Sequence, residues 1–234
     1  MLAAYYLITV PIFKFVCWRL GLRVEGAENI PRSGPLLLVG KHQREADGVW
    51  AIGSIPRATR IMIKDDANWP TKTILKLLAA MYTVKRGSRD LKAYRQTLRN
   101  LQKGRAVVMF PEGHRSRELI GFHTGVASIA RRIEGVRIVP FAVFNSENLG
   151  VLQIIRHLFK GPPACTPTIR FGVPFVLATT THQQKRVQRL EDIRLIRSKV
   201  AALMPSELIG SNELYKVAGK TQKSIIKTKR AERS

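Results

Sequence analysis

Short apolar runs alternate with segments of helical periodicity along most of the chain. The runs at 35–40, 60–64, 106–110 and 137–144 have the length and composition of buried strands, and 168–172 is a further strand candidate. Helical spacing of apolar residues covers 48–55, 71–82, 89–104, 125–135 and 183–204. The clearest helix, 89–104, ends at Gly104 and has four apolar residues on one face: Leu91, Tyr94, Leu98 and Leu101. This alternation predicts an α/β fold with a mostly parallel central sheet flanked by helices.

The first 18 residues, MLAAYYLITVPIFKFVCW, form an apolar segment that is rich in aromatic residues. A membrane span needs about 20 apolar residues, but here Pro11 interrupts the run and Lys14 adds a charge. A secretory signal is also disfavoured, because no basic residue precedes the run and no small-residue cleavage site follows it. Arg19 and Arg23 come next, as in segments that lie in the headgroup zone of a bilayer. We predict an interfacial or re-entrant membrane helix; the alternative is a core helix of a soluble protein.

The chain has 234 residues and a formal net charge of +24, which indicates a polyanionic partner. Nucleic acid, an anionic membrane and phosphorylated substrates all fit that charge. No RNP-like aromatic motif, zinc-finger spacing or DNA-binding motif is present, so a nucleic-acid partner is not expected. We predict a membrane helix at 1–22, a globular domain at 23–210 and a basic tail at 211–234. The tail is expected to be solvated and partly disordered, to contact anionic lipid, or both.

The two cysteines, Cys17 and Cys165, do not form a metal-ligand spacing such as C-x-x-C. Two cysteines far apart in the sequence are typical of reduced thiols in a cytosolic protein. The sequence therefore predicts neither a disulfide framework nor a metal site.

Two polar clusters directly follow buried strands: KHQREAD at 41–47 and PEGHRSR at 111–117. In a parallel α/β sheet, loops beyond the carboxyl ends of the strands carry the chemistry, so the clusters are predicted to form one site. His42 and Asp47 cannot face each other on a straight helix, because five residues correspond to about 140° around its axis. If they meet, the segment is a turn that enters a helix, and the carboxylate makes the imidazole a general base. The alternative is two solvated side chains in a loop.

The second cluster and a basic segment at 84–90 are suited to binding an anion. Gly113 allows close approach of the backbone to a ligand, and Arg115 can hold a phosphate through two hydrogen bonds. Lys85, Arg86 and Arg89 precede a predicted helix, whose N-terminus attracts anions. The alternative for both segments is an ordinary charged surface turn.

The order and spacing of four short blocks resemble the glycerolipid acyltransferase family. The blocks are H-x-x-x-x-D at 42–47, VKR at 84–86, FPEGHRS at 110–116 and VP at 139–140. The chain most resembles the 1-acylglycerol-3-phosphate (lysophosphatidic acid) acyltransferases, over about residues 23–145. The resemblance implies that 23–210 is an acyltransferase domain.

The resemblance also implies roles for individual residues. His42 would be the general base and Asp47 would orient it. Five further residues would bind substrates, the last of them through the block linked with the acyl donor: Arg86, Glu112, Gly113, Arg115 and Pro140. The sequence departs from the family pattern at four positions, Lys41, Arg44, His114 and His123, where Asn, Ser, Thr and Lys are usual. These departures predict an altered and more basic acceptor pocket.

The implied reaction moves a fatty acyl group from acyl-CoA or acyl-carrier protein to the free hydroxyl of lysophosphatidic acid, giving phosphatidic acid for phospholipid synthesis. Direct transfer is expected, with no metal or bound cofactor. The expected partners are an anionic bilayer at the cytoplasmic face, a lysophospholipid and the acyl donor. One alternative is another acceptor, such as a different lyso-lipid, glycerol 3-phosphate or a glycolipid. Another is a non-enzymatic basic protein that binds membranes or nucleic acid.

Overall fold

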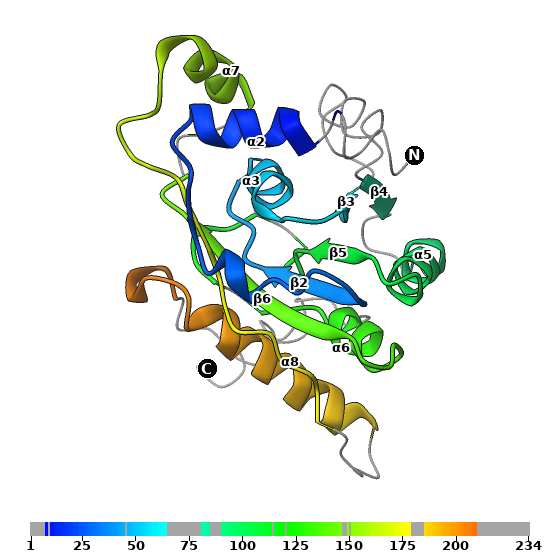
Figure 1. Ribbon diagram of the computed structural model, residues 1–234. Helices are drawn as coiled ribbons and strands as arrows, with labels where there is room; N and C mark the ends of the chain where they lie inside the picture. The colour runs from blue at the N-terminus through cyan, green and yellow to red at the C-terminus, as the bar shows by residue number, and fades with distance from the viewer. Residues whose placement is uncertain are drawn as a thin grey trace, which may run out of the picture.

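A seven-stranded sheet forms the centre of the molecule (Figure 1). The computed structural model describes residues 8, 10–44, 46–64, 81–84, 90–113, 115–119, 121–146, 149, 151–178 and 185–209. The strand order is β1-β7-β6-β2-β5-β3-β4. The strands are β1 (Arg23–Glu25), β2 (Leu36–Gly40), β3 (Thr59–Lys64), β4 (Met81–Val84), β5 (Ala106–Met109), β6 (Arg137–Phe144) and β7 (Thr168–Phe171).

Strands β6, β2, β5, β3 and β4 are parallel to one another, which confirms the predicted mostly parallel sheet. The exception is β7, which pairs antiparallel to β6. Strand β1 pairs parallel to β7 and forms the edge of the sheet. Because β2 lies between β5 and β6, the loops that follow β2 and β5 leave the sheet as neighbours. This topology brings the two polar clusters together, as the sequence predicted.

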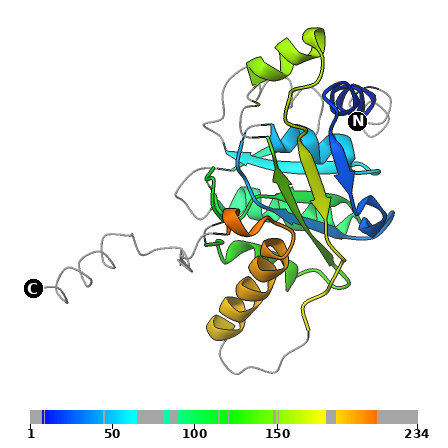
Figure 2. The ribbon, with the colours of Figure 1, turned by 90° about the vertical axis from the view of Figure 1, so that its left-hand side faces the viewer.

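Helices cover both faces of the sheet (Figures 1 and 2). They are α2 (Val10–Arg19), α3 (Asp47–Ser54), α5 (Leu91–Gln102), α6 (Gly125–Ala130), α7 (Val151–Lys160) and α8 (Lys185–Ala201), with short 3-10 turns at Ala27–Asn29 and Ser206–Leu208. Alternate residues of β2 point to opposite faces. Leu36 and Leu38 join the core under α2 and α3, whereas Leu37 and Val39 join the core over α6 and α8.

The predicted helix at 89–104 is observed as α5, and its ends have a clear physical cause. The Asp90 carboxylate accepts a hydrogen bond from the backbone N–H of Ala93 at 2.9 Å and so caps the first turn. Gly104 follows the helix with a φ of 66°. Leu101 is fully buried, but Leu91 is exposed. Tyr94 and Leu98 are partly buried against the same core as Leu101, so three of the four residues predicted to share this face contact the protein interior.

Three elements differ from the sequence-based prediction. Met81 and Tyr82 begin strand β4 rather than ending a helix at 71–82, and residues 71–80 lie outside the described residues. The phenol of Tyr82 is buried and hydrogen-bonds the Thr97 hydroxyl at 2.5 Å, a contact with α5 that local periodicity does not reveal. The sequence also predicted neither β1 nor α7. Strand β1 has three partly exposed residues at a sheet edge and lacks an apolar run.

Helix α2 has one face in the protein core and an apolar face in solvent. Phe13 and Cys17 are buried against α3, where a side chain on Gly53 would come within 2.3 Å of the Cys17 sulfur. On the other side of the helix, Phe15 and Trp18 are exposed. The buried side of α2 fits the alternative of a core helix, whereas contact of its exposed side with a membrane stays a prediction. None of the helices within the described ranges is long and apolar enough to cross a membrane. The predicted tail at 211–234 lies outside the described residues.

The two thiols are unpaired, as the sequence predicted, but their surroundings differ. Burial raises the pKa of Cys17 to about 12, whereas Cys165 is exposed. Because the thiolate is the reactive form, iodoacetamide at mildly alkaline pH should modify Cys165 and leave Cys17 unmodified in the native protein. Mass spectrometry of tryptic peptides measures both sites, and labelling in denaturant is the control. Equal native labelling of the two cysteines would show that α2 does not pack on α3 as described.

Candidate active site

His42 and Asp47 meet in the turn between β2 and α3. The Nδ1 atom of His42 lies 3.0 Å from Oδ2 of Asp47. Strand β2 ends at Gly40 and α3 begins at Asp47, so the intervening residues form the turn that the sequence required. The predicted contact is therefore present in the structure.

The Asp47 carboxylate is fully buried and is surrounded by donors. Its Oδ2 accepts hydrogen bonds from the backbone N–H groups of Gln43 at 2.6 Å and Arg44 at 2.8 Å. The Ser146 hydroxyl, from the segment after β6, lies 3.5 Å from Oδ1. An ionised carboxylate only accepts hydrogen bonds, so Nδ1 of His42 carries the proton. The lone pair is then on Nε2, which is the basic nitrogen available to a substrate.

Stacked aromatic rings hold the His42 imidazole in place. The His42 ring stacks on Phe110, with centroids 4.4 Å apart and planes inclined by 26°. Phe110 in turn meets the edge of Phe141 at 5.6 Å. Phe141 occupies the space beside Gly40, where an added side chain would come within 2.3 Å of its ring. The His42 side chain is 24% exposed, so it is supported from the core and still reachable from solvent.

A buried ion pair joins the two loops of the site. Lys41 and Glu112 have fully buried side chains, and Nζ of Lys41 lies 3.1 Å from Oε2 of Glu112. The ammonium also donates to the Ser116 carbonyl oxygen at 2.6 Å and hydroxyl at 2.8 Å. The same Glu112 oxygen accepts the backbone N–H of His42 at 3.2 Å. Burial lowers the pKa of Lys41, and the negative charge of Glu112 opposes that shift.

This ion pair corrects one expectation from the sequence. Lys41 stands where the family pattern has Asn and was expected to make the acceptor pocket more basic. Its ammonium is instead directed into the protein, where Glu112 and Ser116 bind it. Glu112 was predicted to bind substrate; in this structure its buried carboxylate holds Lys41 and the His42 backbone. Contact between Glu112 and the acceptor stays a prediction.

Backbone conformation and close packing both favour glycine at position 113. Its φ is 70°, a left-handed conformation that other residues rarely adopt. A side-chain carbon at this position would come within 2.8 Å of Nε2 of His123. The backbone N–H of His123 also donates to the Pro111 carbonyl at 2.8 Å. His123 is thus packed against the loop after β5 at the position where the family pattern has Lys.

The other predicted residues that the structure describes lie in different elements from the His42–Asp47 pair. Arg115 is exposed on the loop after Gly113. Pro140 is buried inside the sheet, where it pairs with Val39 and its carbonyl accepts the N–H of Gly172 at 2.8 Å. By strand alternation its ring faces the α8 side, opposite Val139 and Phe141. Arg86 and His114 lie outside the described residues.

Sequence reasoning assigned no positioning role to three residues that hold the site in place. Phe110 supports the His42 ring, and Ser146 contacts Asp47. The Ser116 hydroxyl accepts a hydrogen bond from Lys41, and its backbone N–H donates to the His42 carbonyl at 3.1 Å. Phe110 carried a usable signal, since it ends a buried strand immediately before the second polar cluster. Ser146 carried none, because its contact with Asp47 spans 99 positions of the chain.

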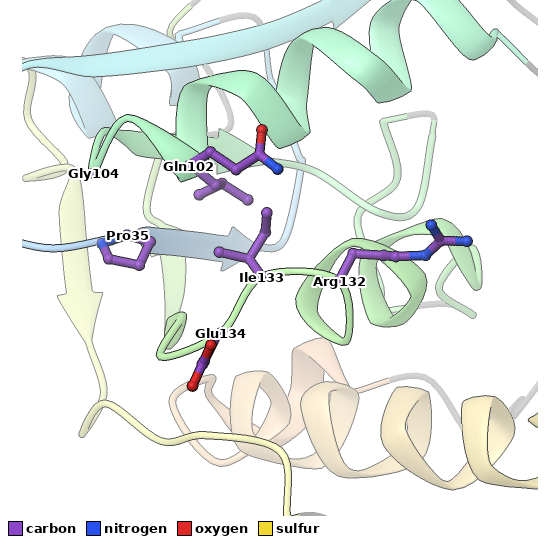
Figure 3. Close-up of a pocket in the computed structure, with 7 residues that line it drawn as sticks. Pro35, Gln102, Gly104, Arg132, Ile133 and Glu134 are labelled. Atoms are coloured by element: carbon purple, nitrogen blue, oxygen red, sulfur yellow. The ribbon is translucent and has the colours of Figure 1, made fainter.

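A surface hollow of about 420 Å³ lies at the other end of the sheet (Figure 3). Its lining includes Pro35, Gln102, Ile133 and Glu134. Pro35 immediately precedes β2, whereas His42 follows the end of that strand. The hollow is therefore at the amino ends of the parallel strands and is not part of the His42 site.

The buried ion pair predicts how single and double substitutions change stability. Lys41→Met should lower the free energy of unfolding by about 3–5 kcal/mol, because it leaves the Glu112 carboxylate buried without its partner. The double variant Lys41→Met/Glu112→Gln should recover part of that loss. Urea unfolding followed by circular dichroism measures both. The exposed Lys103→Met is the matched control, with an expected change within about 0.5 kcal/mol. A Lys41→Met protein as stable as this control would contradict the role of the pair.

The chain is similar to a protein of known activity. A curated relative, 1-acyl-sn-glycerol-3-phosphate acyltransferase from Borreliella burgdorferi, is 26% identical over 149 residues, which are 61% of this chain. The chain spans 59% of the length of that relative.

A solved structure shares the fold. It is the crystal structure of the 1-acyl-sn-glycerophosphate (LPA) acyltransferase PlsC from Thermotoga maritima, with a TM-score of 0.60 and 18% sequence identity. The match covers 85% of this chain and 81% of that chain. The model of the family described as Acyltransferase matches residues 21–144, which include His42, Asp47, Glu112 and Pro140. Since this match covers more than half of the chain, the protein belongs to the Acyltransferase family.

Proposed function

We propose that this protein transfers a fatty acyl group from acyl-CoA or acyl-carrier protein to the free hydroxyl of lysophosphatidic acid, which gives phosphatidic acid. The observation that carries the proposal is the His42–Asp47 pair, with Nδ1 bound to a buried carboxylate and the ring reachable from solvent. A pair of this kind supplies a general base for a hydroxyl nucleophile. The family match supports acyl transfer as the reaction class.

The choice of lysophosphatidic acid as acceptor is supported by the similar proteins. The relative from Borreliella burgdorferi and the Thermotoga maritima structure both carry names that specify this acceptor. The positive charge of the chain also suits a phosphorylated acceptor and a phosphorylated donor. Arg86 and Arg115 are the side chains proposed to bind the acceptor phosphate, with Gly113 allowing the lipid to approach the backbone.

The proposed reaction proceeds in two steps. Nε2 of His42 takes the proton from the acceptor hydroxyl as its oxygen bonds to the thioester carbonyl carbon, forming a tetrahedral intermediate. Asp47 stabilises the imidazolium that results. The intermediate then collapses, the carbon–sulfur bond breaks, and the imidazolium returns its proton to the leaving thiolate. His42 ends the cycle neutral, the acyl group is on the acceptor oxygen, and the donor leaves as a free thiol.

Direct transfer without an acyl-enzyme fits the side chains at the site. Ser116 supplies the side-chain hydroxyl in the two motif loops, but its oxygen accepts from Lys41 and donates to the Glu118 carbonyl at 2.7 Å. A nucleophilic serine needs an adjacent base to remove its proton. Neither a metal nor a bound cofactor is required by the proposed chemistry.

A membrane location on the cytoplasmic face is part of the proposal. The lysophospholipid acceptor is found in a bilayer, and α2 exposes Phe15 and Trp18 near Arg19. Aromatic and basic residues of this kind favour the headgroup zone of an anionic membrane. The non-enzymatic alternative would need only these surface features and would give no reason for the buried Asp47.

Substitution of the catalytic pair tests the reaction. His42→Ala and Asp47→Asn should each lower the rate constant of acyl transfer roughly 100- to 10,000-fold, because general-base catalysis contributes about that much. The assay follows free thiol release from acyl-CoA in mixed lipid vesicles. Glu134→Gln, at the opposite end of the sheet, is the matched control and should keep full activity. A folded His42→Ala protein with normal turnover would disprove the mechanism. No turnover in any variant, including the wild type, would instead support the non-enzymatic alternative.

The acceptor is tested by offering purified protein a panel of acceptors. Lysophosphatidic acid should give the highest product yield, measured by mass spectrometry of extracted lipids. The panel also contains lysophosphatidylcholine, lysophosphatidylglycerol, glycerol 3-phosphate and a glycolipid. Preference for any other member of the panel would retain the acyltransferase reaction and replace the proposed acceptor.

A further inference from the structure

Helix α7 is amphipathic, and it presents large apolar side chains to solvent. Its inner side contributes Ile154 to the core beneath α2 and α3. Ile155 and Phe159, one turn apart on the outer side, are 49% and 84% exposed. Nothing in the catalytic chemistry accounts for a Phe that is almost fully in water. Such a pair on a stable helix indicates a surface that is covered by a partner.

The exposed side of α2 has the same character. Ile12, Phe15 and Trp18 follow one another at three-residue intervals, opposite the buried Phe13 and Cys17. Trp18 is 74% exposed, and its ring centroid lies 5.9 Å from that of Phe15. Two helices far apart in the sequence therefore both direct apolar and aromatic side chains outward.

The two helices meet at their carboxyl ends. A side-chain carbon on Gly161, immediately after α7, would lie 3.8 Å from Nη1 of Arg19. One on Gly21, just after α2, would lie 3.5 Å from Pro162. Both views of the ribbon show α7 and α2 on the same side of the sheet (Figures 1 and 2). Their exposed apolar residues, Ile12, Phe15, Trp18, Ile155 and Phe159, are called the docking surface below.

The basic residues beside the docking surface indicate the charge of its partner. Lys14 and Arg19 of α2 and Arg156 and Lys160 of α7 are exposed or half-exposed, and neither helix contains an acidic residue. Aromatic side chains bordered by basic ones match the boundary between acyl chains and anionic headgroups. A second copy of this chain is disfavoured as partner, because a symmetric contact would bring these cations together.

We propose that α7 and α2 form one docking surface for an anionic lipid bilayer, with α7 a membrane-contacting helix in its own right. This proposal deepens the proposed function, and it names the part of the fold beyond the N-terminal segment that contacts lipid. It also explains the location of the site. Helix α7 begins five residues after Ser146, whose hydroxyl contacts Asp47, and α2 packs on α3, whose first residue is Asp47. Docking therefore holds the catalytic turn close to the lipid layer.

Vesicle binding tests the proposal directly. The full chain is mixed with sucrose-loaded vesicles of phosphatidylcholine and phosphatidylglycerol, or of phosphatidylcholine alone, and the sedimented fraction is measured. Ile155→Ser/Phe159→Ser should lower the partition coefficient on anionic vesicles by at least about tenfold, given the apolar area removed from the lipid contact. Phe15→Ser/Trp18→Ser should cause a similar loss. The matched control, Leu91→Ser on α5, removes a leucine that is 59% exposed and lies outside the docking surface, and this variant should bind as wild type.

Three results would overturn the proposal. The first is wild-type binding by the α7 variant while the α2 variant is defective, which would leave α2 as the contact. The second is equal binding of the wild type to neutral and anionic vesicles. The third is a lipid-free dimer that the α7 substitutions dissociate, detected by light scattering, which would make a second copy the partner.

The binding test is independent of turnover. Loss of vesicle binding in the α7 variant, together with no acyl transfer by the wild type, would support the docking surface and contradict the proposed function. Acyl transfer by the wild type, together with binding that does not depend on α7, would support the proposed function and contradict the docking surface. The two proposals can therefore fail separately.

Discussion

The fully buried ammonium of Lys41 joins the two loops on which the candidate site is built. It binds Glu112 and Ser116 from the loop after β5, while it belongs to the turn after β2. Because β2 and β5 are adjacent parallel strands, this contact fixes how their carboxyl ends emerge relative to each other. A buried ion pair adds little net stability against an apolar pair, since both charges lose their water. We infer that its value here is positional: Glu112 also binds the His42 backbone.

The contacts of His42 divide into two kinds that act on different parts of the residue. Backbone contacts with Glu112 and Ser116 fix where the residue sits. Asp47 and Phe110 fix the ring, one through Nδ1 and the other by stacking on its face. The ring therefore has little freedom to rotate, and Nε2 keeps one direction. Such preorganisation is what a general base needs, because reorientation during the reaction would add to the barrier.

Local features of this protein could be predicted from the sequence, and contacts between distant segments could not. The apolar runs at 35–40 and 106–110 predicted strands β2 and β5, and helix geometry required a turn if His42 and Asp47 were to meet. The Lys41–Glu112 pair links positions 71 residues apart, and a single sequence does not show that they meet. Helix α7 is amphipathic and is followed by Gly161 with a φ of 106°, a local stop signal that the sequence analysis did not use, whereas β4 is defined by pairing with β3 rather than by its own pattern.

The net charge shows why composition alone says little about a partner. Some of the basic residues are bound inside the protein. Lys41 pairs with Glu112, and the guanidinium of Arg57 donates to the carbonyls of Pro31 and Gly34. Only cations at the surface can contact an anionic partner directly. Arg156 and Lys160 are of that kind, and they border exposed apolar side chains. The proposed membrane contact therefore rests on charge and apolar surface at one place rather than on the total charge.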